Sequence, residues 1–460
     1  MSQSQDDVPD FQAFDQLSAE RREQWLEQLF TLLRQESISH DGTGMDTCAV
    51  MVQQLLEQAG LQTRIFDEGQ YPIVYGELIR DQQLPTVLFY GHYDVMPPDP
   101  LEEWHSDPFA PEIRNGKIYA RGAGDNKGQF LAHIIAIQSC LELHGQLPIN
   151  VKILIEGEEE TGSRSLPIFV EQHRDLLQAD LVYTSDGPQH VSGAPVVLLG
   201  VRGALAIKLT SHGAQWDNHS GNKGNIVPNP IWSLVHLLDS MRSRDGKILV
   251  DGFFDDVRAV SDAEAEALRQ LPFELDDLAR QVGYAALDMD GESYYRRLTM
   301  EPTLNIHGIH SGSTGKGIIP AKAEAYIDVR LVPDQHPQQV YDKLARHVQQ
   351  HAPDIIIEQV MSVPPSRTPV DLDIIQTVIQ TVTEAYPLAP VIQPGMGGTL
   401  PNYVWTDILK APSVIVPYAP YDEANHSPNE NTGVDDFLYG IRCTYHLLHR
   451  LAADTARTAV

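Results

Sequence analysis

A length of 460 residues favours two domains over a single core. The formal net charge of −30, with 33 Lys and Arg against 63 Asp and Glu, argues against a nucleic acid as partner. Three widely spaced cysteines argue against a disulfide framework. The polar N-terminus lacks the pattern of a signal peptide. No apolar run approaches the roughly 18 residues of a membrane span. We therefore predict a cytoplasmic protein with no membrane contact.

The first 200 residues alternate between helical and strand patterns, which is typical of an α/β layer architecture. A flexible start from Met1 to about Leu17 is expected, followed by Ser18 as the N-cap of a helix. The expected helices of this region cover 20–35, 45–59 and 129–143, and the expected strands cover 61–66, 73–79, 86–90 and 151–155, with one more beginning at 181. Asn115-Gly116 predicts a tight hairpin turn.

The pattern changes near Gly200 and changes back after Pro365. Between these points we expect strands at 201–210, 323–331 and 355–360, helices at 230–242 and 338–350, and a charged helical stretch at 251–300. A helix to Tyr386, a strand at 413–416 and a last helix at 434–452 follow. The sequence therefore predicts a discontinuous mixed-sheet α/β domain with helices on both faces, 1–199 plus 366–460, and a smaller inserted α+β domain, 200–365.

A histidine and a carboxylate come directly after the apolar strand 87–90. His92 and Asp94 are two residues apart, so in an extended chain they point to the same side. A neutral imidazole suits zinc, and a nearby carboxylate can hold its other nitrogen. A hydrogen-bonded loop with no metal would use the same two residues, so this pair alone does not decide.

Four further acidic residues also stand near the end of an apolar strand or the start of a helix. Asp125 precedes a helix in a Gly-rich stretch that lacks a phosphate-loop pattern, and it is read as an N-cap, a metal ligand or both. Glu159 and Glu160 belong to an acid run that would ordinarily be a solvated face, but here follows a buried strand. Asp186 follows another apolar strand. Ligands in open α/β sheets bind at the carboxyl ends of strands, so these side chains are expected at one edge.

Five motifs in order then resemble one family. They are Gly91-His-Tyr-Asp-Val-Met-Pro97, Gly122-Ala-Gly-Asp-Asn-Lys-Gly128, Ile155-Glu-Gly-Glu-Glu-Glu-Thr-Gly-Ser163, Ser185-Asp186 and His426-Ser-Pro-Asn-Glu430. The set is similar to the co-catalytic zinc peptidases and aminoacylases, which include carnosinase, cytosolic nonspecific dipeptidase, glutamate carboxypeptidase and acetylornithine deacetylase. Each motif is weak by itself, but their order and spacing cover nearly the whole chain.

The resemblance implies two divalent metal ions per subunit, zinc first and manganese or cobalt as alternatives. It assigns His92 and Asp186 to one ion, Glu160 and His426 to the other, and Asp125 to both, on a cis Asp125–Asn126 peptide. Asp94 would hydrogen-bond His92, and Glu159 would be the general base that activates a metal-bridging water.

The resemblance also assigns residues to substrate and partner. His219 would reach the active site of the other subunit of a homodimer, although a lone loop histidine is ordinarily a surface residue. Arg330 would bind the C-terminal carboxylate of a small peptide, with Thr399 assisting, although a strand arginine is ordinarily one side of a surface salt bridge. The motifs around 301–309 and 329–333 look most like the carnosinase and cytosolic dipeptidase group.

The predicted function is metal-dependent hydrolysis of the amide bond of dipeptides or similar short peptides. The alternatives are an N-acyl amino acid deacylase on the same scaffold and a non-catalytic metal-binding relative. Asn126, Thr161 and Pro428 depart from residues that are common in the family, and 252–291 carries no motif, so substrate preference does not follow from the resemblance.

Overall fold

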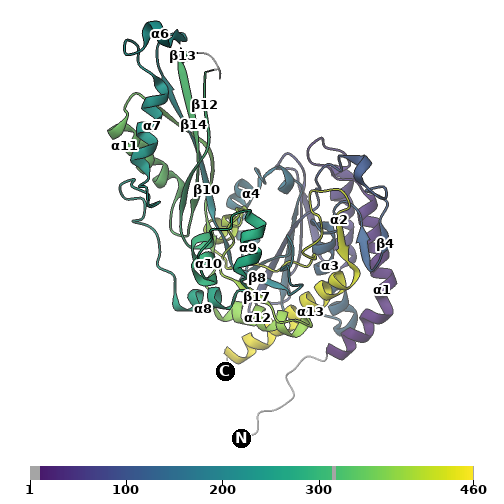
Figure 1. Cartoon of the computed structure of the whole chain (residues 1–460). Helices are drawn as coiled ribbons and strands as arrows, with labels where there is room; N and C mark the ends of the chain where they lie inside the picture. The colour runs from purple at the N-terminus through teal and green to yellow at the C-terminus, as the bar shows by residue number, and fades with distance from the viewer. Residues whose placement is uncertain (1–10, 313–316, 459–460) are drawn as a thin grey trace. The chain divides into compact units, whose positions relative to one another are not determined.

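A computed structural model describes residues 11–312 and 317–458 of the chain (Figure 1). The chain divides into two compact units. The larger unit comprises Met1–Leu199, Thr368–Pro394 and Val404–Val460, and the smaller unit comprises Gly200–Arg367 and Gly395–Tyr403. The segment Gly395–Tyr403, which the sequence placed in the larger domain, thus belongs with the smaller unit. There the backbone N–H of Arg202 donates to the carbonyl oxygens of Met396 and Gly398.

The larger unit is built on an eight-stranded mixed sheet. Its strands, in spatial order, are β1 (Gln62–Phe66), β2 (Ile73–Leu78), β6 (Asn150–Glu156), β3 (Thr86–His92), β7 (Leu181–Thr184), β18 (Ser413–Ile415), β8 (Val196–Leu198) and β17 (Val391–Gln393). Strands β6, β3, β7 and β18 run parallel. Their near-continuous apolar sequences suit strands that are buried on both faces, and β3 and β6 are buried almost throughout.

Four helices of this unit pack against one another: α1 (Phe11–Arg34), α3 (Lys127–His144), α12 (Asp373–Ala385) and α13 (Val434–Thr458). Helix α2 (Met45–Gln58) packs on β1 and β2. The prediction of a flexible start to Leu17 and a cap at Ser18 is wrong from residue 11 onward, because α1 begins at Phe11 and buries Phe14 and Leu17. Residues 1–10 lie outside the described part.

A three-stranded sheet connects distant parts of the same unit. The predicted hairpin is confirmed: β4 (Glu112–Arg114) and β5 (Lys117–Tyr119) pair across Asn115-Gly116, where both residues have positive φ. Strand β19 (Asn431–Gly433) pairs with β5, with Asn431 opposite Tyr119. This pairing brings the loop that contains His426 near the segment that leads to Asp125.

The smaller unit contains a four-stranded antiparallel sheet, β12 (Thr303–Ser311), β14 (Lys322–Leu331), β10 (Gly203–His212) and β15 (Ile356–Val363) in spatial order. Helices α7 (Pro230–Met241) and α11 (Pro337–His351) pack on it. Side chains of β14 alternate between buried, as at Ile327 and Val329, and half-buried, as at Asp328 and Arg330. The half-buried side chains define what we call the open face of this sheet.

The charged stretch after 251 is helical, as expected. Helices α8 (Asp262–Gln270), α9 (Leu275–Val282) and α10 (Gly291–Thr299) occupy it, and α8 packs on α10. The remaining short elements of the two units are η2 (Leu101–Glu103), η3 (Glu159–Thr161), α4 (Leu166–Gln172), α5 (Arg174–Leu177), β9 (Gly200–Val201), β11 (Asn218–His219), α6 (Ser220–Lys223), β13 (Ile318–Ile319), β16 (Ser366–Arg367) and a π-helical turn, Val404–Leu409.

The mixed sheet of the larger unit and the separate antiparallel sheet of the smaller one confirm the predicted fold class. Cys48, Cys140 and Cys443 are buried free thiols. Within residues 11–312 and 317–458, none of the helices combines the length and the apolar character needed to cross a membrane.

Candidate active site

The candidate site lies where parallel strands of the larger unit end. In the register of β3 and β6, His92 pairs with Glu156, so the residues that follow both strands emerge side by side. Asp186 comes two residues after β7, the other neighbour of β3. The parallel arrangement therefore delivers His92, Glu159, Glu160 and Asp186 to one edge, as the strand pattern predicted.

Asp125 comes to this edge from the loop before α3. The peptide between Asp125 and Asn126 is cis, as the resemblance implied. The N-cap position of α3 is occupied by Asn126, not by Asp125, and no side chain caps the helix. The alternative of Asp125 as an N-cap is therefore wrong. Its two carboxylate oxygens instead face two different histidines.

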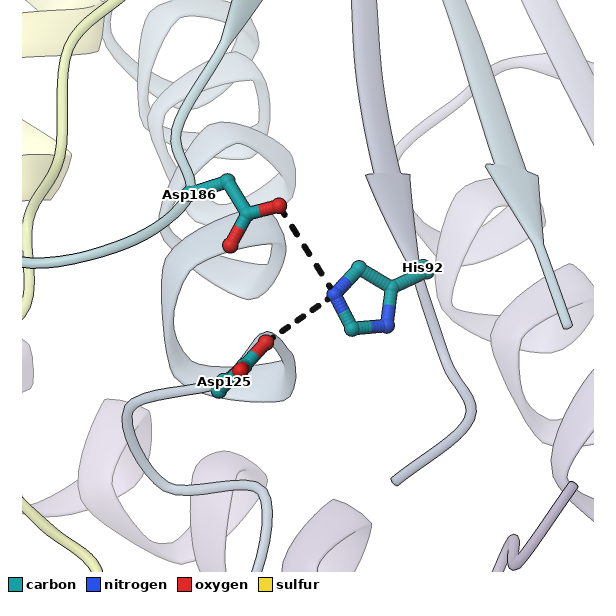
Figure 2. A group of neighbouring side chains, drawn as sticks. All are labelled: His92, Asp125 and Asp186. Atoms are coloured by element: carbon teal, nitrogen blue, oxygen red, sulfur yellow. Dashed lines mark ion pairs between the residues drawn. The ribbon is translucent and has the colours of Figure 1, made fainter. Parts of the chain in front are cut away.

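These two contacts place Asp125 at the centre of the site. Its Oδ1 lies 3.0 Å from His92 Nε2, and its Oδ2 lies 3.1 Å from His426 Nε2. His92 Nε2 is also 3.9 Å from Asp186 Oδ2, and Figure 2 shows both aspartates facing this nitrogen. His426 Nε2 is 3.0 Å from Glu160 Oε2. Two groups of potential ligand atoms result, His92 with Asp186 and Glu160 with His426, and Asp125 belongs to both.

The donor set fits two divalent cations. Ligand atoms about 2 Å from a tetrahedral ion lie roughly 3.3 Å from one another, close to most of the separations observed. All five residues offer imidazole nitrogen or carboxylate oxygen, which suits Zn²⁺ and also Mn²⁺ or Co²⁺. His92 Nε2 is buried and makes no well-directed hydrogen bond in the described residues, although Asp125 Oδ1 lies 3.0 Å away, as expected if both atoms face a metal.

The carboxyl groups of the site have more negative charge than the protein itself neutralises. Burial raises the pKa of Glu160 to about 7, with Asp125 adding repulsion. Burial and then Asp125 raise the pKa of Asp186 to about 6. Burial also raises the pKa of Glu159 well above its ordinary value; His92 opposes that shift, and Asp186 and Asp125 add to it. Cations in the site would reverse these shifts.

The two histidines report the same excess of negative charge. Hydrogen bonds to Asp125 and Glu160 raise the pKa of His426 to about 10. Burial works against a charge on His92, but its carboxylate neighbours Asp125 and Asp94 outweigh burial and raise its pKa well above the ordinary value. Both imidazoles thus lie where a positive charge is stabilised.

Asp94 joins His92 to Glu159 and Glu160. Its Oδ1 lies 3.3 Å from His92 Nδ1, and its backbone oxygen lies 3.1 Å from the same nitrogen. Its carboxylate also accepts the backbone N–H groups of Glu159 and Glu160, at 3.2 and 3.0 Å. One buried carboxylate therefore fixes the orientation of the imidazole and the start of the acidic turn.

Glu430 is the last residue of the fifth motif, and no role was predicted for it. Its Oε1 accepts the N–H groups of Gly124 and Asp125, and its Oε2 accepts those of Gly122 and of Arg121 Nη1, the last at 2.7 Å. Glu430 and Arg121 are both 1% exposed. Glu430 and Arg121 thus hold the loop that presents Asp125. Glu430 stands four residues after His426.

Glu423 is a second residue that sequence reasoning missed. It is 1% exposed, and its carboxyl oxygens have no hydrogen-bond partner in the described residues. It packs against Gly124, where a Cβ would lie 2.3 Å from Glu423 Oε2. Burial, with repulsion from Asp125 and Glu430, raises its pKa to about 10, which favours the neutral acid. Glu423 stands only three residues before His426, but a buried neutral carboxyl has no signature in sequence.

Arg330 and Thr399 meet within the smaller unit. Arg330 Nη1 donates to Thr399 Oγ1 at 3.0 Å, and Arg330 Nε donates to Asp328 Oδ2 at 3.1 Å. Thr399 in turn donates to the backbone oxygen of Arg202 at 2.8 Å. The ion pair to Asp328 is the ordinary alternative that the sequence left open for Arg330, and it is present together with the contact to Thr399.

His219 lies in β11, which pairs with β13, and its side chain is exposed. None of the described hydrogen bonds or ion pairs joins it to Arg330 or Thr399, the other candidate residues of its unit.

Comparison with known proteins identifies the family. The family model described as peptidase family M20/M25/M40 matches residues 88–450, which include every candidate residue. The chain belongs to peptidase family M20/M25/M40.

Among relatives in this family, human Beta-Ala-His dipeptidase is 30% identical over 387 residues, covering 81% of this chain and 76% of the relative. The Cys-Gly metallodipeptidase dug1 of Schizosaccharomyces pombe is 30% identical over 404 residues, covering 83% of each. An M20 family metallo-carboxypeptidase from Sulfolobus solfataricus has a similar structure, with a TM-score of 0.81 and 33% identity, and the match covers 93% of this chain and 99% of that one.

The M20 assignment confirms the resemblance drawn from the five motifs, including its placement near the carnosinase and dipeptidase group. It also confirms that the protein is a hydrolase of the metallopeptidase class.

Proposed function

We propose that the protein is a metallodipeptidase that hydrolyses the amide bond of dipeptides or similar short peptides. The observation that carries this proposal is the pair of ligand groups that share Asp125, with Glu159 beside them at the same sheet edge. The family and the names of the relatives, two of them dipeptidases, support the reaction class.

Two divalent cations complete the site in this proposal. His92 and Asp186 would hold one, Glu160 and His426 the other, and Asp125 both, with zinc as the first choice and manganese or cobalt as alternatives. When bound, such ions supply Lewis acidity, which lowers the pKa of water and polarises an amide carbonyl. Their charge also favours the ionised form of the buried carboxyls, which the protein alone does not.

Glu159 is the proposed general base. Its carboxylate accepts a proton from the attacking water and returns it to the nitrogen of the leaving amine. Asp94 anchors the backbone N–H of Glu159, which limits the movement of the residue during both transfers. Glu159 stands three residues after the end of β6, at the start of η3, so its position depends on the end of a buried strand.

Arg330 and Thr399 are the proposed binding groups for the carboxylate of the substrate. A guanidinium matches a carboxylate with two parallel N–H donors, and the bond to Thr399 Oγ1 holds one end of that fork in place.

We further propose a homodimer in which His219 of one subunit donates a hydrogen bond to the developing oxyanion in the other. Strand β12 is an edge of its sheet, and beside it Trp232, Val235, Ile306 and Ile309 are exposed on α7 and β12. A hollow of about 680 Å³ lies among these elements. Open strand edges with apolar neighbours are typical of surfaces that pair with another chain.

Mixing two inactive variants tests this arrangement. His219→Ala and Glu159→Gln each lose activity, but a heterodimer has one site with both native residues. Random exchange of subunits should restore about one quarter of the native activity, because half of the dimers are mixed and each has one native site. A mixture that stays inactive while light scattering shows exchanged dimers contradicts the role of His219, and an active monomer contradicts the dimer.

Metal removal and a substrate panel test the function itself. A chelator should abolish hydrolysis of free dipeptides, and Zn²⁺ or Mn²⁺ should restore it. The panel compares free dipeptides, tripeptides and N-acetyl amino acids of the same C-terminal residue by kcat/KM. Dipeptides should be hydrolysed fastest, whereas faster hydrolysis of N-acetyl amino acids would indicate the deacylase alternative.

We also propose a cytoplasmic location, because the three cysteines are buried free thiols.

A further inference from the structure

Arg202 is a buried arginine without a carboxylate partner. It is 8% exposed and precedes β10 by one residue. Its Nε donates to the carbonyl oxygen of Gly397 at 3.0 Å, and Nη1 and Nη2 have no acceptor within residues 11–312 and 317–458. Four of the five N–H groups of its guanidinium are therefore unused. Arg121, which is 1% exposed, differs because Glu430 pairs with it at 2.7 Å.

The neighbour of Arg202 is a second positive charge. In the register of β10 and β14, Ala204 lies opposite Arg330, and Arg202 is two residues before Ala204. Alternation along the chain thus places Arg202 and Arg330 on the open face of the sheet, diagonally beside each other. Thr399 connects them, because it accepts from Arg330 Nη1 and donates to the backbone oxygen of Arg202.

The charges of this cluster do not balance. Asp328 pairs with Arg330 through Nε, and none of the described carboxylates lies within ion-pair distance of Arg202. Burial and, after it, repulsion from Arg330 lower the pKa of Arg202 to about 10, and Asp328 opposes this shift only in part. A largely buried positive charge without an ionic partner is unfavourable, and a bound anion would relieve that cost. Two guanidinium groups and one carboxylate leave room for one more negative charge.

The backbone around Arg202 fixes where that charge would bind. The loop Gly395–Tyr403 passes so close that a Cβ on Gly397 would lie 3.4 Å from Arg202 Nη2 and 2.8 Å from Leu298 of α10. Gly397 thus confines the guanidinium while its carbonyl oxygen orients it. Leu298 of α10 thus packs behind the loop that contains Thr399.

We propose that Arg202 binds the single C-terminal carboxylate of the substrate together with Arg330, so that two guanidinium groups hold one carboxylate. The proposal rests on the dipeptidase function above and adds a binding residue to it. It also specifies the ligand: a peptide with a free C-terminal carboxylate, and no selection for a second carboxylate on the C-terminal side chain.

Paired substrates separate binding from a purely structural role. Ala-Ala and its C-terminal amide have the same scissile bond, and Ala-Glu and Ala-Gln differ by one charge. For Arg202→Gln, KM for Ala-Ala should rise about 10- to 100-fold with kcat changed less than about threefold, while the amide should lose far less. Arg202→Lys should recover part of the loss, because it restores the charge. Lys208→Gln removes a charge from the same strand and should leave all four substrates unchanged.

Two results would overturn the proposal. Equal losses on Ala-Ala and its amide in Arg202→Gln mean that Arg202 only supports the loop. A preference for Ala-Glu over Ala-Gln that disappears in Arg202→Gln means that the cluster takes a second carboxylate.

If the native protein hydrolyses none of the four substrates, the proposed function fails. Calorimetric binding of an Ala-Ala analogue with a reduced peptide bond then still decides the role of Arg202: the native protein should bind it at least about tenfold more tightly than Arg202→Gln.

Discussion

The two units contain sites with opposite charge imbalance. In the larger unit, Glu159, Glu160 and Asp186 gather around Asp125, and burial raises the pKa of the first three. In the smaller unit, Arg202 and Arg330 lie together, and Asp328 forms an ion pair with Arg330 but not with Arg202. The first site lacks positive charge, and the second lacks negative charge.

Internal ion pairs elsewhere in the same units show that this imbalance is local. Arg121 pairs with Glu430 in the larger unit, and Arg367 lies 3.3 Å from Glu264 in the smaller one. Each of these buried charges has a partner supplied by the fold. This difference is what we expect if the two unbalanced sites serve the proposed ligands, cations in one case and a carboxylate in the other, and not stability.

Removing the shared ligand should have the largest effect. Asp125→Asn takes one negative charge from both ligand groups, so we expect metal content to fall from two ions to one or fewer. Hydrolysis of Ala-Ala should fall at least about 10³-fold, because bound cations supply most of the activation of water. Elemental analysis and kinetics of the same sample measure both. Asp422→Asn, an exposed aspartate paired with Lys117, is the matched control and should change neither.

The carboxylate site should respond differently, through KM. Arg330→Lys keeps the charge but loses the fork and its contact with Thr399, so KM for Ala-Ala should rise about 10- to 100-fold with a smaller change in kcat. Metal content should remain at two ions. A variant with reduced metal content would break the separation between the two sites.

Glu430→Gln tests whether an internal pair serves the metal site. The substitution removes the charge that faces Arg121 and weakens the acceptor of the Gly124 and Asp125 N–H groups. We expect metal affinity to fall about 10- to 100-fold, measured by competition with a coloured chelator. Glu112→Gln, on the exposed side of β4, is the control. An unchanged affinity in a folded Glu430→Gln protein would leave the pair with a purely structural role.

The smallest effect concerns stability in acid. Burial lowers the pKa of His133 to about 3, and burial with neighbouring cations lowers that of His446 to about 3. An unfolded histidine binds a proton near pH 6.5, so stability present above that pH is lost as the pH falls toward 3. The slope is up to about 1.4 kcal/mol per pH unit for each group. Urea unfolding of His133→Gln between pH 7 and 4 should show a shallower slope, and an unchanged slope would contradict the assignment.

Sequence patterns predicted most of the elements because apolar periodicity follows burial directly. Helix α3 and strands β3 and β6 came within a few residues of their observed bounds. The start of α1 was missed because its first turns mix acidic and aromatic residues, and only packing on α13 shows that Phe14 is buried. Likewise, no local pattern assigns Gly395–Tyr403 to the smaller unit, since that depends on hydrogen bonds to Arg202.

The candidate site was predictable where a motif stood next to an apolar strand. His92, Asp94, Asp186 and the acid pair after β6 were all placed by that rule. Glu423, Glu430 and Arg202 were not, because their importance arises from contacts between segments far apart in the chain. Charge imbalance is a property of three-dimensional neighbours, and a single sequence does not record it.

The most direct test of the account is metal content and hydrolysis measured together on Glu159→Gln. Glu159 belongs to neither ligand group, so the variant should bind two divalent ions per subunit like the native protein. Its kcat for Ala-Ala should nevertheless fall about 10²- to 10⁴-fold, since proton transfer by a general base contributes that much. Two bound ions with near-native turnover would contradict the assignment of Glu159 and with it the proposed mechanism.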